Sequence, residues 1–221
     1  MTIWVTRKAG AELLRDERVK PGLTAIQAVD LAADVETRYG GRFVSSIDGI
    51  SSDLDGQEDW FFLINGIEPD VGAAEIKVGD GDLVWWDYRS WIDSAAHPAV
   101  AVGAFPHPFH RGWKGVVRPV EVVAPVALAE VSAELESFLA QSTPDDADAE
   151  PHRFALELRP EAEGAELSAT MGSKNGSAVT FVLSGNELAL NAAARALIAS
   201  PQIIARRYTA SFDAAGRVIE P

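Results

Sequence analysis

Two aromatic segments with turn signals at their ends place the strongest constraint on how this chain can fold. Residues 59–70 read DWFFLINGIEPD and residues 80–91 read DGDLVWWDYRSW, and each alternates large apolar side chains over the length of a strand. Successive side chains of a strand point to opposite faces, so both faces of each strand carry aromatic or aliphatic residues. The pattern predicts two neighbouring, central strands. A segment this rich in Trp and Tyr also suits a surface that receives a flat ligand.

The residues before the aromatic segments predict a small mixed sheet crossed by one helix. Residues 3–6 and 13–19 are typical of a hairpin. A helix over 25–39 is expected, because Thr24 and Gln27 form a capping box ahead of apolar residues at helical spacing. A strand over 43–50 follows. This order of elements is typical of a β-grasp with a five-stranded mixed sheet and one helix.

The second half of the chain predicts another α+β unit. Its expected helices cover 127–141 and the residues that follow the cap residue Asn186. The pair Asn175-Gly176 is typical of a type I′ hairpin turn. The expected strands cover 99–104, 116–123, 154–158, 167–174, 177–183 and 203–212.

The sequence therefore predicts an α+β protein of two domains. The first is a β-grasp over residues 1–93, and the second is an α+β domain of unknown role over residues 98–221. Residues 93–98 are the expected boundary. Residues 142–151, which read STPDDADAEP, are an acidic loop or linker, because they combine proline with acidic side chains.

The charge and composition exclude several kinds of partner and site. The chain has 33 acidic and 19 basic residues, a formal net charge of -14. Nucleic acids and anionic membrane surfaces attract Lys/Arg surfaces, so we expect neither as a partner. We expect no membrane insertion, since no apolar run approaches the about 20 residues of a span. The N-terminus lacks the apolar stretch of a signal peptide, and a removed leader or anchor stays open. There is no cysteine, which excludes disulfides and thiolate ligands.

Three stretches between Gly22 and Trp91 carry a family resemblance. They are GLTAIQAVDLAADV in the expected helix, FVSSIDGI in the third strand and DWFFLINGIEPDVGAAEIKVGDGDLVWWDY in the remainder. The most specific marks are the tryptophan five residues before Asn65-Gly66, the turn at 72–74 and the run at 79–82 before an aromatic strand. With these residues the stretch resembles the transcobalamin C-terminal-like domain family, a β-grasp family with bacterial surface and secreted members.

The resemblance implies a capture function. In the transcobalamin-like proteins, the corresponding domain closes over one face of a corrinoid through loops and a sheet edge, without covalent chemistry. It thus implies a non-enzymatic binding module. Because bacterial members are typically exported, it also implies an extracellular or cell-surface location.

The candidate ligand-binding residues lie on and beside the two aromatic strands. The rings could form a stacking platform, to which Asp87 and Arg89 would add orienting polar contacts. Alternatively, alternate rings fill the two sides of a central strand. The Asn65 side chain could present its amide to a ligand, although a turn that needs left-handed backbone is the favoured explanation. The candidates are Trp60, Asn65, Trp85, Trp86, Asp87, Tyr88, Arg89 and Trp91.

Two groups of side chains raise the question of a metal, and neither predicts one. The acidic loop 51–59 resembles part of a calcium loop but lacks the terminal bidentate glutamate, so a hydrated loop is favoured. The imidazoles of His97, His107 and His110 lack a recognisable zinc spacing, and the prolines beside them favour a loop. We therefore predict no metal and no cofactor.

The sequence favours binding over catalysis. It has no Gly-x-Ser-x-Gly nucleophile motif and no phosphate-binding loop that ends in Lys-Ser or Lys-Thr, so no enzyme is predicted. The leading hypothesis is a module that captures a small planar ligand, a corrinoid among the candidates, or a protein partner, through the aromatic strand. One alternative is a structural or assembly protein that pairs through a sheet edge. The other is a metal-dependent hydrolase built on the three histidines.

Overall fold

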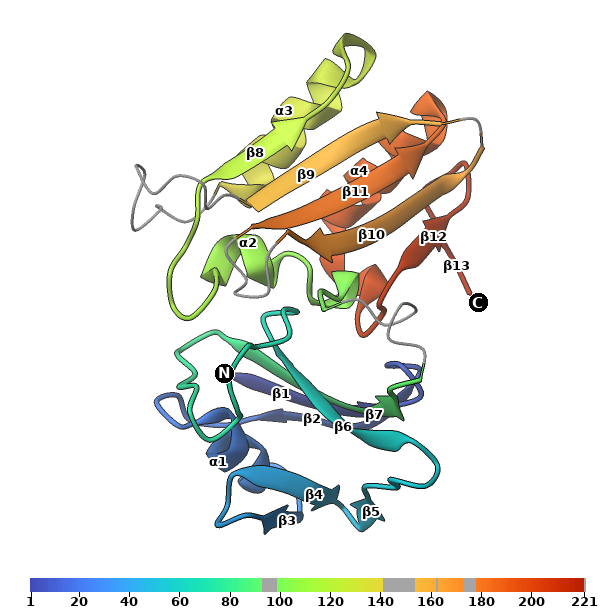
Figure 1. Ribbon diagram of the computed structural model, residues 1–221. Helices are drawn as coiled ribbons and strands as arrows, with labels where there is room; N and C mark the ends of the chain where they lie inside the picture. Colours follow the sequence, from blue (N-terminus) through green and yellow to red (C-terminus); the bar gives the residue numbers. More distant parts are fainter. Residues whose placement is uncertain (93–98, 141–153, 162, 173–177, 221) are drawn as a thin grey trace.

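The chain folds into two sheet regions, one above the other in Figure 1. A computed structural model describes residues 1–92, 99–140, 154–161, 163–172 and 178–220. The predicted α+β class is confirmed, with mixed sheets in both regions. The expected boundary at 93–98 and the acidic loop at 142–151 lie outside the described residues, so the division into two domains at residue 93 stays a prediction.

The N-terminal region is built on a four-stranded mixed sheet in the order β2-β1-β7-β6. Strand β1 pairs antiparallel with β2 and parallel with β7, and β7 pairs antiparallel with β6. The parallel pair needs a crossover connection, which the segment with helix α1 supplies. The predicted first hairpin and both aromatic strands are confirmed. The strands are β1 (Thr2–Arg7), β2 (Glu12–Arg18), β6 (Glu58–Ile64) and β7 (Leu83–Ser90).

The helix predicted over 25–39 is much shorter in the structure. Helix α1 (Ala25–Asp30) begins at the predicted capping box, but β3 (Val35–Arg38) occupies the expected last turns. Strand β3 pairs with β4 (Phe43–Ile47), and β4 pairs with β5 (Ile50–Ser51). The prediction of a single five-stranded sheet is therefore wrong in detail, because the structure has a four-stranded and a three-stranded sheet instead.

The side chain of Asp48 explains why the helix ends early. Its Oδ1 accepts a hydrogen bond from the backbone N–H of Asp34 at 3.1 Å, and its Oδ2 accepts one from Nε of Arg15 at 2.8 Å. In a continued helix the Asp34 N–H would bond to the carbonyl four residues earlier. The residues that follow include the β-branched Val35 and Thr37, which suit a strand. A long-range hydrogen bond thus overrides the helical pattern.

The C-terminal region is built on a six-stranded sheet in the order β13-β12-β10-β11-β9-β8. The pairs β8–β9 and β9–β11 are parallel, and the other pairs are antiparallel. The predicted turn at Asn175-Gly176 lies outside the described residues, while the strands on either side of it pair as expected. The strands are β8 (Val120–Val123), β9 (Phe154–Pro160), β10 (Ala165–Met171), β11 (Val179–Gly185), β12 (Ala210–Phe212) and β13 (Val218–Ile219).

Helices α3 (Ala129–Leu139) and α4 (Glu187–Ala199) pack on each other and on the same sheet, as Figure 1 shows. A short 3-10 turn, η2 (Val126–Leu128), leads into α3. Alternate residues of β11 are buried, as expected for a sheet with one covered face. The predicted cap of α4 is confirmed, because the Asn186 side chain accepts a hydrogen bond from the backbone N–H of Ala189 at 2.9 Å.

The segment after residue 99 connects the two regions and does not form the strand expected at 99–104. It forms a 3-10 turn, η1 (Val102–Ala104), and helix α2 (His107–Arg111), which lie between the two sheets in Figure 1. The backbone N–H of Ala101 donates to the carbonyl of Gly66 at 2.8 Å, and that of Gly103 donates to the carbonyl of Arg207 at 2.7 Å. The segment is thus bonded to both regions.

The strand expected at 203–212 is also shorter than predicted. Residues 201–204 form a 3-10 turn, η3 (Pro201–Ile204), and the strand β12 begins only at Ala210. Residues 205–209 lie between these elements and contact the N-terminal region, since the Tyr208 phenol donates to Oδ2 of Asp87 on β7 at 3.2 Å. The region therefore contributes a connecting segment, and not a strand, to the junction between the two sheets.

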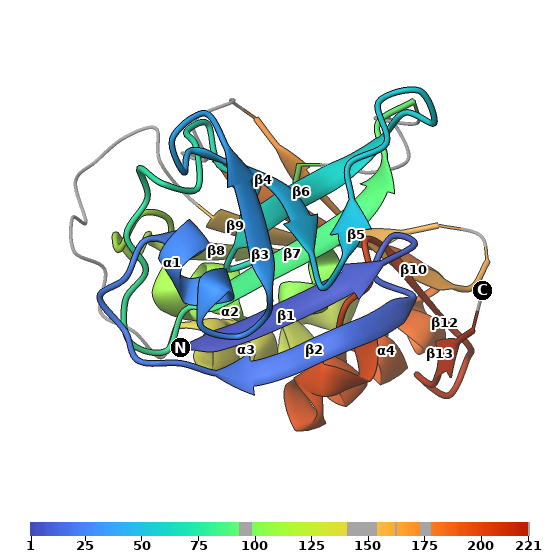
Figure 2. The same cartoon turned by 90° about the horizontal axis from the view of Figure 1, so that it is seen from below.

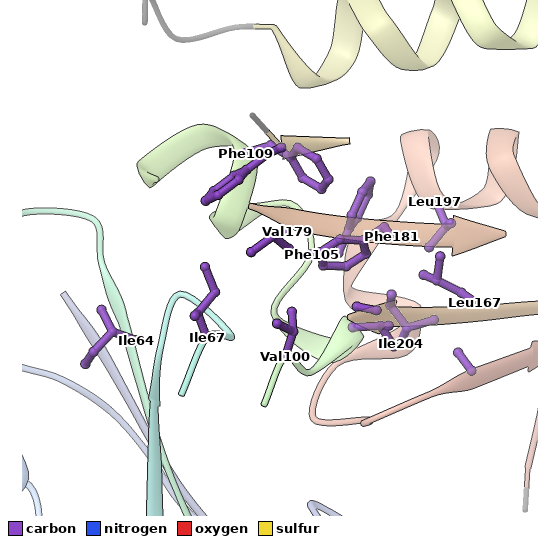
Figure 3. Packing of buried hydrophobic residues seen from close by; sticks show 14 of the residues in the cluster. Ile64, Ile67, Val100, Phe105, Phe109, Leu167, Val179, Phe181, Leu197 and Ile204 are labelled. Carbon is purple, nitrogen blue, oxygen red and sulfur yellow. The ribbon is translucent and has the colours of Figure 1, made fainter. Parts of the chain in front are cut away.

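Most buried apolar side chains form one cluster across both regions, and Leu63, Trp85, Ala101 and Tyr208 form a second, smaller cluster. Figure 3 shows Ile67 and Val100 on the N-terminal side and the rings of Phe105, Phe109 and Phe181 beyond them. The ring centroids of Phe109 and Phe181 are 5.1 Å apart. On the opposite side, the small sheet β3-β4-β5 covers the outer face of the four-stranded sheet (Figure 2). The four-stranded sheet is therefore covered on both faces.

We predict that Asp48→Ala lowers the free energy of unfolding by about 2 kcal/mol, because it removes a cap-like hydrogen bond and places alanine at a left-handed backbone position. Asp48→Asn keeps an oxygen for the Asp34 N–H and tolerates the φ of +50°, so it should cost less than about 1 kcal/mol. Urea denaturation measures both values. Equal losses in the two variants would contradict this role for the hydrogen bond.

Candidate functional site

Most of the predicted aromatic platform is buried. The exposed fractions of Trp85, Trp86 and Trp60 are 0%, 2% and 6%. The Trp86 ring stacks on Phe62 with the centroids 5.0 Å apart, and Nε1 of Trp60 donates to the carbonyl of Ile50 at 2.9 Å. The expectation that these three rings form an accessible surface is wrong, because the sheet is covered on both faces. The alternative, that alternate rings fill the two sides of a central strand, describes them correctly.

The Asn65 side chain is used inside the fold. Its Nδ2 donates to Oδ1 of Asp82 at 2.9 Å, and its Oδ1 accepts from the backbone N–H of Leu83 at 2.9 Å. The backbone φ of Asn65 is +52°, as expected for an Asn-Gly turn. These contacts fix the turn against the start of β7. Beyond the other end of β7, Trp91 is half-buried.

Asp87 lies at the centre of a buried hydrogen-bond network between the two regions. Its Oδ1 accepts hydrogen bonds from Oγ1 of Thr6 at 2.7 Å and from the backbone N–H of Gly10 at 3.1 Å. Its Oδ2 accepts a hydrogen bond from the phenol of Tyr208 at 3.2 Å. Thr6 and Gly10 belong to the first hairpin, and Tyr208 precedes β12. One carboxyl group thus joins three distant segments.

Trp85 contacts two members of this network, Thr6 and Tyr208. Its Nε1 donates to Oγ1 of Thr6 at 2.7 Å, so the threonine hydroxyl accepts from Trp85 while it donates to Asp87. The ring centroids of Trp85 and Tyr208 are 5.2 Å apart. The indole that the sequence offered as a ligand platform therefore holds Tyr208 and Thr6 in place.

Burial controls the titration of both acids in this network. It raises the pKa of the Asp87 carboxyl above its usual range, although the hydrogen bonds from Thr6 and Gly10 and the charge of Arg89 oppose the shift. Burial, followed by the neighbouring Asp87 carboxylate, holds the pKa of the Tyr208 phenol well above its usual range. Tyr208 therefore stays protonated at neutral pH and remains a hydrogen-bond donor.

Arg89 lies beside the network, two residues after Asp87 on β7. Its exposed fraction is 4%, and its guanidinium carbon lies 4.5 Å from the Phe61 ring centroid and 4.8 Å from that of Tyr208. Its Nη2 donates to Oε2 of Glu68 at 3.1 Å. Two rings and one ion pair thus fix the plane of the guanidinium.

Two cavities flank the turn of the first hairpin beside this network. The larger, of about 660 Å³, lies between residues 9–11 and the residues 205–209, Ser211, Ile219 and Glu220. The smaller, of about 310 Å³, lies where β1 and β7 end, and is lined by residues 7–9, Glu58 and residues 88–90. Of the predicted ligand-binding residues, Tyr88 and Arg89 therefore line a cavity.

The wall of the larger cavity contains residues that the sequence did not single out. Arg206, Arg207 and Tyr208 all line it. Arg207 pairs with Glu220 at 2.7 Å, and the Arg206 guanidinium carbon lies 5.8 Å from the Trp4 ring centroid. The φ of Arg206 is +62°, which is uncommon for a residue with a side chain. The run Arg-Arg-Tyr in a chain of net charge -14 is the signal that could have revealed this wall.

Two of the possible metal ligands from the sequence, Asp53 and His107, make contacts inside the fold. Oδ1 of Asp53 accepts from the backbone N–H of Gly56 at 2.8 Å, inside the acidic loop. Nδ1 of His107 lies 3.1 Å from the carbonyl oxygen of Ala104, and burial lowers the pKa of this imidazole. His97 lies outside the described residues. Within the described ranges, no group of three His, Asp or Glu side chains could hold a metal ion.

Comparison with known proteins identifies part of the chain. Residues 22–90 match the family model "Domain of unknown function (DUF4430)", so a DUF4430 domain runs from just before α1 to the end of β7. A solved structure of a "putative metal binding protein" from Ruminococcus gnavus is similar at 20% sequence identity, with a TM-score of 0.32, over 40% of this chain and 94% of that chain. The search of curated proteins gives no match. In the described parts of the chain, no helix is long and apolar enough to cross a membrane.

The close approach of the hairpin turn to the C-terminal region predicts an unequal response of two glycines. A Cβ on Gly10, with φ +82°, would overlap the carbonyl oxygen of Arg206 and lie 2.9 Å from Cζ2 of Trp85, whereas one on Gly41, with φ +84°, would meet nothing within 4 Å. Gly41→Ala should therefore cost only the left-handed strain of about 1 kcal/mol. Gly10→Ala should cost more than about 3 kcal/mol in the same thermal or urea unfolding experiment. Similar losses would show that the junction adjusts freely.

The raised pKa of Asp87 predicts a pH-dependent difference between the wild type and Asp87→Asn. Because the folded-state pKa lies above the unfolded value of about 3.9, stability from this group is present at low pH and is lost as pH rises through the folded-state pKa. Unfolding free energies measured from pH 4 to pH 7 should thus shift in favour of the asparagine variant. Asp48→Asn should shift in the opposite direction, because Arg15 lowers the pKa of Asp48. A pH-independent difference for Asp87→Asn would contradict the assignment.

Proposed function

We propose that this protein is a non-enzymatic binding module that holds a small, flat molecule in the larger cavity, between residues 9–11 and 205–209. The observation that carries this proposal is the cavity of about 660 Å³ at the junction of the two sheet regions. Binding sites for small molecules are concave and occur preferentially where structural units meet. The volume lies inside the usual range of about 300–1,000 Å³ for such sites.

The wall of this cavity is preorganised for binding. Tyr208 is fixed by its hydrogen bond to Asp87 and by its contact with the Trp85 ring. A wall that is already ordered loses little conformational entropy when a ligand binds, which favours affinity. Beside it, Arg206 is half-buried over the Trp4 ring, and a guanidinium plane can stack on a flat ligand. Asp87 and Trp85 of the aromatic strand β7 thus hold Tyr208, a residue of the cavity wall, in position.

The resemblance of residues 22–91 to the transcobalamin C-terminal-like family makes a corrinoid one candidate ligand. All the residues that line the cavity lie outside that stretch, so other flat molecules are candidates of equal rank. The same resemblance supports an extracellular or cell-surface location as part of the proposal. A nucleic acid partner is not proposed, because the net charge of -14 opposes it.

Binding is favoured over the other two functions that the sequence suggested. Two histidines of the suggested hydrolase lie against backbone carbonyls inside the fold, His107 Nδ1 at 3.1 Å from that of Ala104 and His110 Nε2 at 3.0 Å from that of Phe138. Pairing through the edge strand β2 is disfavoured, because β2 carries exposed charged side chains at Arg15, Asp16 and Glu17.

We predict that at least one of three flat probes, cobalamin, riboflavin or benzimidazole, shifts the backbone amide signals of residues 9–11 and 205–209 in a saturable manner in ¹H–¹⁵N NMR. Arg206→Asn should weaken that binding about tenfold, the effect expected from loss of one stacking or charge-assisted contact. Asparagine is chosen because it tolerates the positive φ of residue 206.

The matched control is Lys114→Asn, which also replaces a basic residue at positive φ but lies on the turn next to Trp113. Its binding should equal that of the wild type. If none of the three probes moves the signals of the cavity residues, or if Arg206→Asn and Lys114→Asn weaken binding equally, the proposal fails.

A further inference from the structure

Two guanidinium groups at the smaller cavity have an N–H group without a hydrogen-bond partner among the described residues. They are Nη1 of Arg89 and Nε of Arg7, and both nitrogens are buried. Both arginines line the smaller cavity. Unpaired buried donors are rare in folded proteins, because each loses its hydrogen bonds to water without gaining another. Two such donors at one cavity leave hydrogen-bonding capacity for an acceptor from outside the chain.

The contacts of Arg89 hold its guanidinium in a fixed position. The rings of Phe61 and Tyr208 contact its guanidinium, and Glu68 takes its Nη2. The guanidinium cannot turn its Nη1 toward another protein group without breaking these contacts. The Arg89 side chain is therefore already ordered before a ligand binds, and binding loses little further conformational entropy.

Arg7 is oriented by a different partner on the neighbouring hairpin strand. Its Nη2 lies 2.6 Å from Oε1 of Glu12, and Nζ of Lys8 lies 3.3 Å from the other oxygen of the same carboxylate. Glu12 thus occupies Nη2 of the guanidinium and leaves Nε without a partner among the described residues. The two arginines approach the cavity from β1 and β7, which are adjacent parallel strands.

The surrounding charges favour a ligand with one negative charge over a multiply charged one. The cavity lining and its ion-pair partners hold three basic and three acidic side chains, so no excess positive charge is present for a multiply charged anion. A carboxylate carries a single charge, and its two oxygens match two separate N–H donors. The six side chains are Arg7, Lys8, Arg89, Glu12, Glu58 and Glu68.

We propose that the smaller cavity is a binding site for a small monocarboxylate, with Nη1 of Arg89 and Nε of Arg7 as the donors to its carboxylate. The volume of about 310 Å³ suits a compact molecule. Ala9 and Tyr88 also line the cavity, and the Tyr88 side chain is fixed by its hydrogen bond to the carbonyl of Ser51 at 3.1 Å. This site lies across the hairpin turn from the larger cavity and does not depend on a ligand there.

Benzoate is the probe that tests this proposal, because it joins a carboxylate to a compact apolar ring. In ¹H–¹⁵N NMR it should produce saturable shifts at the amides of Lys8, Ala9 and Ser90 at millimolar concentration. Benzyl alcohol, which lacks the charge, and inorganic phosphate at about pH 8, where it is mainly the dianion, should not produce them. Arg7→Gln should weaken benzoate binding about tenfold, the effect of one hydrogen bond to a charged group.

Arg15→Gln is the matched control, because Arg15 lies on the same hairpin and has a similar side-chain exposure, 44% against 39% for Arg7. Each arginine also forms an ion pair with one acidic residue. Benzoate should bind Arg15→Gln as it binds the wild type. Absence of saturable shifts in the folded wild type overturns the proposal. So does an equal loss in Arg7→Gln and Arg15→Gln, or an equal response to phosphate.

Arg89→Lys provides a second, independent measurement. Lysine keeps the positive charge but cannot place an N–H at the Nη1 position while it also reaches Glu68. In a variant whose NMR spectrum shows a folded chain, benzoate affinity should fall by at least as much as in Arg7→Gln. Unchanged affinity in folded Arg89→Lys would remove Arg89 from the site and overturn the proposal.

Discussion

The buried carboxyl group of Asp87 is the constraint on which the junction of this protein depends. A carboxyl group in the interior is costly unless its oxygens are hydrogen-bonded. Here the donors are Thr6, Gly10 and Tyr208, which come from both ends of the chain. The hairpin turn and the segment before β12 can therefore occupy only positions that bring these donors to β7. The walls of both cavities follow from this requirement.

Close backbone contact makes the same junction rigid. A Cβ on Gly103 would overlap the backbone nitrogen of Arg207, and a Cβ on Gly10 would overlap the carbonyl of Arg206. The two glycines thus let the connecting segment and the hairpin turn approach residues 206–207 from two sides. Arg206 takes its left-handed backbone conformation at this point. Backbone strain of this kind persists only where the surroundings determine it, and it is common at ligand sites.

Local patterns predicted the elements that depend on local interactions. The aromatic strands, the hairpins and the cap of α4 at Asn186 are of this kind. The prediction failed where a distant group takes the backbone hydrogen bond, as Asp48 does at the end of α1 and Arg207 does beside η1. At the site, Tyr88 and Arg89 could be named from the sequence, since they end an aromatic strand. Tyr208 could not, because its partner lies 121 residues away.

The alternation of side chains on β7 explains how a buried aromatic strand can still determine recognition. Trp85, Asp87 and Arg89 share one face, which is the face toward residues 205–209. Trp86 points to the other face and packs on Phe62 within the N-terminal region. A periodic pattern shows that two faces are apolar, but it does not show which of them meets another part of the chain. Trp85 and Asp87 orient Tyr208, which lines the larger cavity, and Arg89 lines the smaller one. One face of a single strand therefore helps to shape both cavities.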